Sequence, residues 1–449
     1  MFDNRDSIDF RNSEIPKIFR SLFIPTLLGM MFNVAFTLTD GIFVGHGVGP
    51  EGLACVNLVA PIMMVVTGLG MLFGIGGSVV AAIHLGKGNE KAARINVTQA
   101  FGCSIAVAVL MGTVFYCFPD GMLKLLGVSG NLMPLAKEYY VWFIPTCLFL
   151  MFQLVGEFMI RLDGSPRYAM YANIIPAVVN IVLDYVFIIP MQMGLKGAAL
   201  ATDIGTAVGM AMAFYYMFFR CRTLRFYRVK GTKTSVRLTV RNVAYMAKLG
   251  FSAFIGEIAI SVMMLTGNLV FGRYLGDEGI AAYSVICYIF PLVYMIYCAV
   301  AQSAQPIISY NHGAEQPERS RKTFVHSVSI SLAFGAAMTL VSLFLAPAVV
   351  SVFIDGGTRA AQLAAEGLPL YSLGFVFVAF NVSAIGYYQS IEQATWATVL
   401  MTLRGIVLLV ASFLLLPSLW GKYGLWLAVP VAEVITALVI GVRYILSRR

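Results

Sequence analysis

The chain has 449 residues and a formal net charge of +9, and 59% of its side chains are apolar while only 12% are charged. A soluble globular domain typically has about 25% charged residues, so this composition excludes an ordinary soluble enzyme or binding domain. We therefore interpret the chain as an integral membrane protein.

Apolar runs recur along almost the whole chain, each long enough at about 20 residues to cross a hydrocarbon layer of ~30 Å. Strand-like alternation is absent, and glycine and proline fall inside the runs, as helical spans tolerate. We expect an all-α integral membrane protein with about twelve transmembrane helices. The predicted spans are residues 15–45, 52–85, 95–118, 138–161, 166–190, 194–219, 242–272, 279–311, 322–354, 363–390, 393–417 and 423–446.

Positive charge predicts the orientation of these spans. With the N-terminus inside, most basic residues at the span ends fall on one side of the membrane, which marks that side as cytoplasmic. An even number of spans then returns both termini to the cytoplasm. The basic residues on this side are Arg5, Arg11, Lys17, Arg20, Lys87, Lys91, Arg94, Arg161, Arg167, Arg319, Arg321, Lys322, Arg443, Arg448 and Arg449. The basic excess therefore follows from topology, and we expect membrane lipid and no nucleic acid as a partner.

One strongly basic segment divides the chain. Residues 219–242 contain eight lysines and arginines and no acid, including Lys230. We interpret residues 220–241 as a cytoplasmic linker between an N-terminal lobe, 1–219, and a C-terminal lobe, 242–449. The linker either lies against anionic lipid headgroups or serves as a solvated topology anchor.

The sequence on one side of this linker repeats on the other. The stretch "GHGVGPEGLACV" from Gly45 resembles "GRYLGDEGIAAY" from Gly272, and the same offset of 227 positions pairs Gly86 with Gly313. Chance similarity between apolar helices would not also align the loops. We expect two pseudo-symmetric six-helix lobes with the same orientation around a central cavity, as in transporters that work by alternating access.

Polar residues inside the predicted membrane spans gather in the first lobe. Asn33, Thr37 and Asp40 are spaced i, i+4, i+7 and therefore share one face of the first helix. Asn180 and Asp184 are likewise four residues apart on the fifth helix. A charged residue at this depth is expensive and is a functional candidate by default.

The sixth span adds Thr202 and Asp203. If the faces converge, the oxygen-rich cluster would consist of Asp40, Asn180, Asp184 and Thr202. Two carboxylates close together in a low-dielectric site cannot both ionise cheaply, so one takes a proton or both share a cation. The alternative is a structural role in which each acid only hydrogen-bonds a neighbouring helix.

The second lobe offers weaker candidates, Glu257 in the seventh span and Gln302 in the eighth. Glu433 and Arg404 are expected to form a neutral structural pair. The loops are too short for a nucleotide-binding domain and contain no nucleophile motif or metal-ligand spacing. We expect a secondary active transporter, not an enzyme, with no cofactor and with Na⁺ or H⁺ as the coupling ion.

Together these residues resemble the multidrug and toxic compound extrusion (MATE) family over nearly the full chain. The resemblance rests on the repeated turns "VGPEGLA" and "LGDEGIAA" and the repeated loops "GKGNEKAAR" and "GAEQPERSR". The sequence is most similar to the DinF-like branch and its MepA-type exporters. The resemblance implies a monomer in a bacterial inner membrane that exports amphipathic, often cationic drugs and dyes against inward Na⁺ or H⁺.

The resemblance also implies roles for particular residues. In the DinF-like branch an aspartate on the first helix, an Asn and Asp on the fifth and a Thr on the sixth bind the cation, and a proline matching Pro25 bends the first helix. Glu257 matches an acid of the NorM-like branch, but the tenth span has Asn381 and no acid. A second cation site in the C-terminal lobe is therefore not implied. The matching cation-site residues are Asp40, Asn180, Asp184 and Thr202.

A lipid-linked oligosaccharide flippase of the same superfamily is the alternative function. Such a flippase would be expected to line its cavity with basic residues that bind a pyrophosphate. Arg404 is the exception among basic residues that otherwise lie near the membrane edges. A membrane-embedded enzyme acting on lipids is a second alternative, and it would need a catalytic histidine, cysteine or acid pair near an interface.

Overall fold

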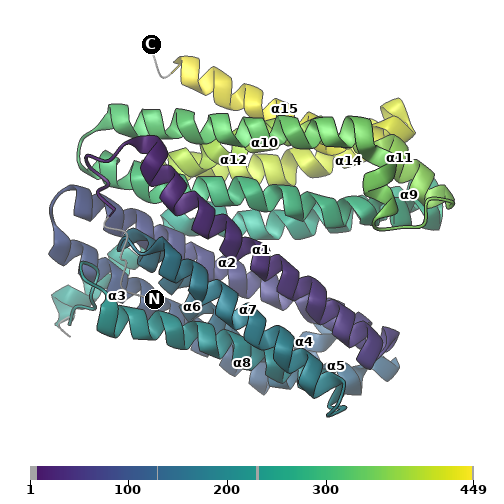
Figure 1. Ribbon diagram of the computed structural model, residues 1–449, viewed down its shortest axis with the longest axis horizontal. Coiled ribbons are helices and arrows are strands. Elements are labelled where there is room, and N and C mark those ends of the chain that lie inside the picture. Colours follow the sequence, from purple (N-terminus) through teal and green to yellow (C-terminus); the bar gives the residue numbers. More distant parts are fainter. Residues whose placement is uncertain (1–7, 129, 229–231, 447–449) are drawn as a thin grey trace. The chain divides into compact units, whose positions relative to one another are not determined.

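The computed structural model describes residues 8–128, 130–228 and 232–446, and this part of the chain is built from helices and short connections without a strand (Figure 1). Arg5, Lys230, Arg448 and Arg449, which figure in the predicted topology, lie outside the described residues. Helices dominate because a membrane offers the backbone no water, so each span must satisfy its own N–H and C=O groups.

The helix bounds follow the predicted spans closely. The first helices are α1 (Ile15–Gly47), α2 (Pro50–Gly86), α3 (Glu90–Cys117), α4 (Pro119–Leu125), η1 (Gly130–Leu132), α5 (Met133–Phe143), α6 (Thr146–Leu162), α7 (Pro166–Ile188), α8 (Gly194–Tyr215) and the π-helix η2 (Tyr216–Arg220). The later helices are α9 (Lys233–Gly313), α10 (Pro317–Ser351), α11 (Arg359–Ser372), α12 (Gly374–Ser390), α13 (Ala394–Thr402), the π-helix η3 (Leu403–Val407), α14 (Leu408–Trp420) and α15 (Lys422–Leu446).

The described residues contain 9 helices long and apolar enough to cross a membrane, or up to 11 spans if two bent helix pairs each count as one. The bent pairs are α5 with α6, at 44°, and α11 with α12, at 45°. Each of the twelve predicted spans overlaps one of these segments. Two of them, 242–272 and 279–311, lie in the 81-residue helix α9, whose helical geometry is interrupted at Gly276. The predicted all-α membrane fold is therefore confirmed.

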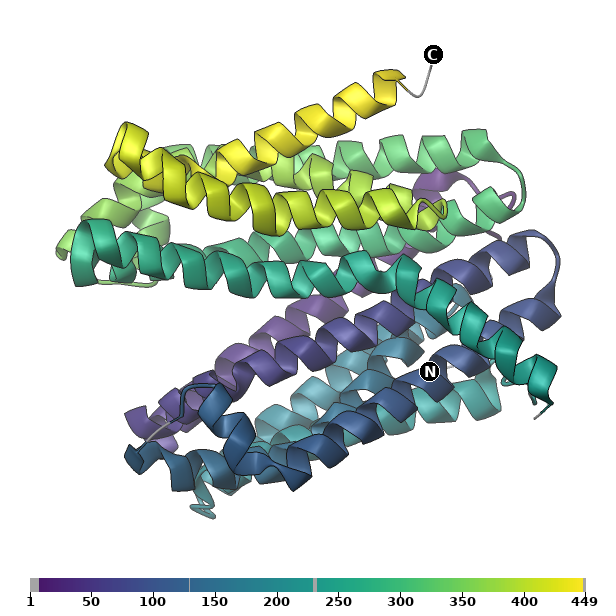
Figure 2. The same cartoon turned by 180° about the vertical axis from the view of Figure 1, so that it is seen from behind.

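The helices form two compact units. The first unit extends to Phe254 and includes Ser309–Gln316, and the second comprises Ile255–Ile308 and the chain from Pro317 onward. In the first unit α1 packs along α7, α7 along α8, and α2 against both α3 and α6. In the second unit α10 packs against α11 and α12, and α15 against α12 and α14, an arrangement visible from both sides (Figures 1 and 2). The lobe boundaries at residues 220–241 stay a prediction.

The first residues of the predicted linker are held by a single carboxylate. Asp163, in the turn after α6, accepts hydrogen bonds from the backbone N–H groups of residues 222–224 at 2.9–3.1 Å. The Tyr216 hydroxyl donates to the same carboxylate at 2.8 Å. Farther along, the Tyr227 N–H donates to the Thr98 hydroxyl of α3 at 2.9 Å. Residues 221–228 therefore lie against the first unit.

The internal repeat is present in the backbone as well as in the sequence. Gly49, between α1 and α2, has φ 100°, and Gly276, 227 positions later, has φ 66°. The next pair at the same offset, Gly88 and Glu315, has φ 73° and 56°. Positive φ is rare outside glycine, so its recurrence at equivalent positions indicates that both turns have the same conformation.

Backbone contacts between α2 and the end of α9 follow the same repeat. A Cβ atom added at Gly86 would overlap the carbonyl oxygen of Tyr310, and one added at Gly313 would overlap the carbonyl oxygen of Ile83. Positions 83 and 310, like 86 and 313, are 227 apart, so the two contacts are reciprocal. All four residues belong to the first unit, where only glycine allows the backbones to approach so closely.

The start of α9 contacts α2 in a similar way. A Cβ at Gly76 would overlap the carbonyl oxygen of Met246, and one at Gly250 would overlap that of Leu72. Within the first unit, residues 233–254 of α9 are therefore fixed against α2 by backbone contact. The partner atoms are carbonyl oxygens, which cannot move aside as a flexible side chain could.

We predict that Gly250→Ala destabilises the protein by about 1–3 kcal/mol, because the added methyl group forces the two backbones apart. Gly102→Ala in α3 is the control, since its Cβ would meet nothing within 4 Å, and it is expected to be neutral or stabilising by up to ~1 kcal/mol. Thermal unfolding of both purified variants in detergent measures the difference. Equal midpoints would contradict the close contact at Gly250.

Candidate functional site

The predicted acidic residues of the first unit lie on three neighbouring helices. Asp40 is in the second half of α1, Asp184 in α7 and Asp203 near the middle of α8. The side chain of Asp184 is fully buried, Asp203 is buried, and Asp40 is partly buried. Because α1 packs along α7 and α7 along α8, residues about 140 to 160 positions apart in sequence come together.

The structure brings the four predicted cation-site residues into one group. The carboxyl groups of Asp40 and Asp184 lie next to each other and interact directly. One turn before Asp184, the Asn180 side chain is 3.4 Å from the Thr202 hydroxyl of α8, to which its Nδ2 donates. The Thr202 hydroxyl in turn donates to the Ala198 carbonyl at 3.1 Å, which leaves its lone pairs facing the group.

Several oxygens of this group are left without a donor. Within the described residues, neither carboxylate oxygen of Asp184, nor Oδ1 of Asp40, nor Oδ1 of Asn180 accepts a hydrogen bond from a donor group. An unsatisfied buried polar atom costs about 1–3 kcal/mol, and a charged one costs more. The donor set is all oxygen, which fits a proton shared between carboxyls or a hard cation such as Na⁺.

Asp203 has a different environment from Asp184. The Thr146 hydroxyl, at the start of α6, donates a hydrogen bond to the Asp203 carboxylate. Tyr139 of α5 is buried near the carboxyl groups of Asp40, Asp184 and Asp203. Asp203 is thus partly satisfied by a neighbouring helix. No group of three or more His, Cys, Asp and Glu suited to a metal ion is found in the described part of the chain.

A cavity of ≈ 250 Å³ adjoins the group within the first unit. Asn33 and Thr37 of α1 line it, and so do Asn180 and Thr202, so the cavity and the predicted cation group share a wall. Asn33 Nδ2 lies 3.4 Å from Asn173 Oδ1, which links α1 to α7. The predicted face of α1 therefore points toward polar groups of α7.

Sequence reasoning missed three residues near this site. Gln153 of α6 and Asn173 of α7 line the cavity, and Gln153 Nε2 donates to the Ala172 carbonyl at 3.1 Å. Tyr139 is the third. Asn173 lies seven residues before Asn180 and so on the same face of α7, a signal that could have identified it. Gln153 stands singly in an apolar segment, and Tyr139, between Glu138 and Tyr140, has no spacing to another candidate that would indicate a site.

Pro25 is buried in α1, ten residues after the helix begins, and α1 continues through it as one helix. A proline inside a helix lacks the N–H that would bond the preceding turn, so the backbone is weaker there. The predicted bend of α1 at Pro25 stays a prediction.

In the second unit the predicted pair of Arg404 and Glu433 is confirmed. Arg404 Nε lies 2.7 Å and 2.8 Å from the two Glu433 carboxylate oxygens, and both side chains are 5% exposed. Asn381 of α12 donates to the same carboxylate at 2.7 Å and to the Glu433 carbonyl at 2.9 Å. The Arg404 guanidinium also lies over the Tyr294 ring, 5.5 Å from its centre. Asn381 thus belongs to the polar cluster around Glu433, although its own Oδ1 accepts no hydrogen bond from the described residues.

The remaining second-unit candidates lie on α9. Gln302 is buried, and Glu257 is partly buried and makes no ion pair with the described residues. Neither residue joins the hydrogen bonds of Arg404 and Glu433. Their predicted contribution to a polar site stays a prediction.

We predict that Glu433→Gln destabilises the second unit by about 3–5 kcal/mol, because Arg404 is left as a buried charge without its partner. The double variant Arg404→Met with Glu433→Leu should recover much of this loss, since it removes both charges. The control is Glu366→Gln, whose exposed partner Lys422 lies 3.0 Å away, and it should cost no more than ~1 kcal/mol. Thermal unfolding in detergent measures all three, and equal effects of the two single variants would contradict a buried pair.

Comparison with known proteins connects this architecture to one family. The sequence model of the family described as MatE matches residues 25–186 and 252–414. The two matched segments begin 227 positions apart, which is the offset of the internal repeat. The family pattern therefore occurs twice in the chain, once in each predicted lobe.

The chain is 25% identical over 435 residues to the multidrug export protein MepA of Staphylococcus haemolyticus, covering 95% of this chain and 93% of that protein. It is 26% identical over 441 residues to MepA of Staphylococcus saprophyticus, covering 96% and 93%. Among solved structures, an outward-facing multidrug resistance MATE family transporter of the MOP superfamily aligns with a TM-score of 0.87 at 22% identity, covering 95% and 94% of the two chains. The chain therefore has the same fold as this solved transporter along nearly its whole length.

Proposed function

Because the chain belongs to the MatE family of secondary transporters, we propose that it is a cation-coupled multidrug antiporter. It exports amphipathic, often cationic drugs and dyes by alternating access, and an inward flow of Na⁺ or H⁺ drives the export. The relatives named multidrug export protein support this class of substrate. We place it in the DinF-like branch and in a bacterial inner membrane, as a monomer with both termini in the cytoplasm.

The observation that carries the proposal is the adjoining pair of Asp40 and Asp184 inside a membrane helix bundle. A structural pair would be neutralised in place, as Arg404 neutralises Glu433. Here two acids face each other, and both oxygens of Asp184 lack a donor. The pair is stabilised when a cation arrives and destabilised when the cation leaves, so its free energy follows the cation concentration on the accessible side.

Coupling requires that the cation bind the two transport conformations unequally, because a ligand with equal affinity for both shifts nothing. The two conformations can bind the cation unequally because its proposed ligands lie on different helices. Asp40 lies on α1, whereas Asn180, Asp184 and Thr202 lie on α7 and α8. A shift of α1 relative to α7 changes the distance between the two carboxyl groups. The residue that would let α1 change shape is Pro25, where the helix lacks one backbone hydrogen bond.

The same α1 movement would act on the substrate. Thr37 and Asn33, about one and two turns before Asp40, line the ≈ 250 Å³ cavity. Closing the gap between α1 and α7 around a cation would reduce the space available beside these residues. We propose that cation arrival in this way favours drug release to the outside.

The flippase alternative depends on a single residue, Arg404. It required a basic side chain within the membrane that is free to bind a pyrophosphate. Arg404 is instead bound by both oxygens of Glu433 and packed on Tyr294. The antiporter is therefore the better supported function.

We predict that Asp184→Asn and Asp40→Asn each reduce gradient-driven ethidium efflux to background, because each variant keeps only one carboxyl group and the proposed shared site for a proton or cation is lost. The control is Asp120→Asn, which removes an exposed acid that pairs with Lys137 at 2.8 Å, and it should transport like the wild type. Efflux is measured first in cells lacking their own exporters and then in proteoliposomes with an imposed Na⁺ or pH gradient. The gradient that supports efflux identifies the ion.

Efflux that persists with unchanged ion dependence in Asp184→Asn would refute the coupling role. A monodisperse, folded wild type that moves no dye under either gradient would refute drug export itself. Ethidium binding by the variants, measured by fluorescence, separates a coupling defect from a loss of the drug site.

A further inference from the structure

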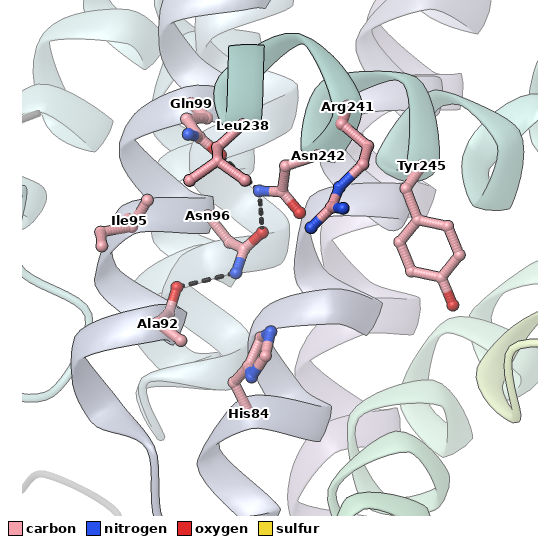
Figure 3. Close-up of a pocket in the computed structure, with 9 residues that line it drawn as sticks. All are labelled: His84, Ala92, Ile95, Asn96, Gln99, Leu238, Arg241, Asn242 and Tyr245. Atoms are coloured by element: carbon pink, nitrogen blue, oxygen red, sulfur yellow. Dashed lines mark hydrogen bonds between the residues drawn. The ribbon is translucent and has the colours of Figure 1, made fainter. Parts of the chain in front are cut away.

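A second polar cavity, of ≈ 580 Å³, lies in the first unit apart from the acidic pair (Figure 3). Asn96 and Gln99 of α3 form part of its wall, and Arg241 and Asn242 of α9 face them. His84, in the last turn of α2, closes one side. The predicted topology places these helix ends at the cytoplasmic edge of the membrane, and none of these residues has a part in the proposed cation coupling.

An amide network fixes one wall of this cavity. The Asn242 side chain donates to both Asn96 and Gln99. Asn96 Nδ2 donates onward to the Ala92 carbonyl at 2.7 Å, and Gln99 Nε2 to the Thr239 hydroxyl at 2.9 Å. These hydrogen bonds link α9 to α3 and fix the orientation of the three amide side chains in the cavity wall.

Arg241 is different from the amides around it. Its guanidinium extends from α9 into the space above His84 (Figure 3), and it makes no hydrogen bond or ion pair with any residue in the described ranges. No acid lines the cavity. A guanidinium offers five donors in a planar fork that matches the oxygens of a phosphate group. The cavity therefore has a fixed positive charge and donors suited to an oxyanion.

The surroundings of Arg241 indicate where such a phosphate would come from. Lys233 and Arg237 lie eight and four residues before it, so the three basic side chains follow one face of α9. Aliphatic side chains alternate with them and are strongly exposed: Val236 55%, Leu238 49% and Val240 64%. Basic and aliphatic side chains mixed on an exposed helix are typical of the boundary between lipid headgroups and acyl chains.

We infer that this cavity binds the phosphate group of an anionic phospholipid, with Arg241 as the principal ligand. The phosphate accepts from the guanidinium beside His84, and the exposed Leu238 at the cavity wall contacts the start of the acyl chains. Occupancy would add a link between α9 and the ends of α2 and α3. This inference does not rest on the proposed transport function.

The test measures binding of dioctanoyl phosphatidylglycerol to the purified full-length protein, by titration and by the rise in the thermal unfolding midpoint, which a bound ligand produces by mass action. Arg241→Gln should weaken binding by at least about tenfold, the loss expected for hydrogen bonds to a charged group. Ala92→Phe fills the cavity without changing charge and should weaken binding similarly. Arg20→Gln removes one exposed charge at the predicted cytoplasmic end of α1 and should bind like the wild type.

Two further ligands identify the source of the phosphate. Glycerol 3-phosphate competing as well as the lipid would support the phosphate site but assign it to a soluble ligand. Dioctanoyl phosphatidylcholine binding at least about tenfold more weakly would support an anionic headgroup. Equal weakening by Arg20→Gln and Arg241→Gln would show diffuse attraction and overturn the inference, and so would intact binding in both Arg241→Gln and Ala92→Phe.

Discussion

A polar side chain buried among membrane helices has no water to satisfy it, and the two units meet this constraint in opposite ways. In the second unit Arg404 and Asn381 both donate to the Glu433 carboxylate at 2.7–2.8 Å, so this acid is neutralised, although Asn381 Oδ1 accepts no hydrogen bond from the described residues. In the first unit Asp184 is fully buried, and neither of its oxygens has a donor among the described residues. The neutralised acid contributes structure, whereas the acid without a donor leaves a requirement that an incoming cation can fill.

Glycine provides the second constraint, since it sets how closely helices of the first unit approach. Gly86 and Gly313 each contact a carbonyl oxygen of the other helix at positions related by the internal repeat. Backbone contact of this kind is short, rigid and independent of side-chain rotamers. The similar contacts of Gly76 and Gly250 hold the start of α9 against α2, which also packs against α3, and Asn242 of α9 donates there to both Asn96 and Gln99 of α3.

Much of this architecture could be predicted from the sequence, because hydropathy reports the requirement that each span satisfy its own backbone. The paired charges at Arg404 and Glu433 could be predicted for the same reason, since an isolated charge at that depth would be too costly. The contact between Asp40 and Asp184 depends on how α1 packs against α7, which the sequence does not specify. The i, i+4 spacing indicates only which residues share one face of a helix. Gln153 and Tyr139 could not be predicted, because their place beside the site depends on how α6 packs against α2, α7 and α8 and on how α5 packs against α8.

The ion pair of Arg404 and Glu433 also bears on the membrane potential. Moving one elementary charge through 100 mV requires ~2.3 kcal/mol of electrical work. The pair has no net charge, so it can move with its helices through the electric field without that work. Asp40 and Asp184 have no such basic partner among the described residues, and in the proposed mechanism their charge changes with the bound cation. A voltage across the membrane would therefore act on the first unit's acids, where the ion is expected to bind, and leave the neutral cluster of the second unit unaffected.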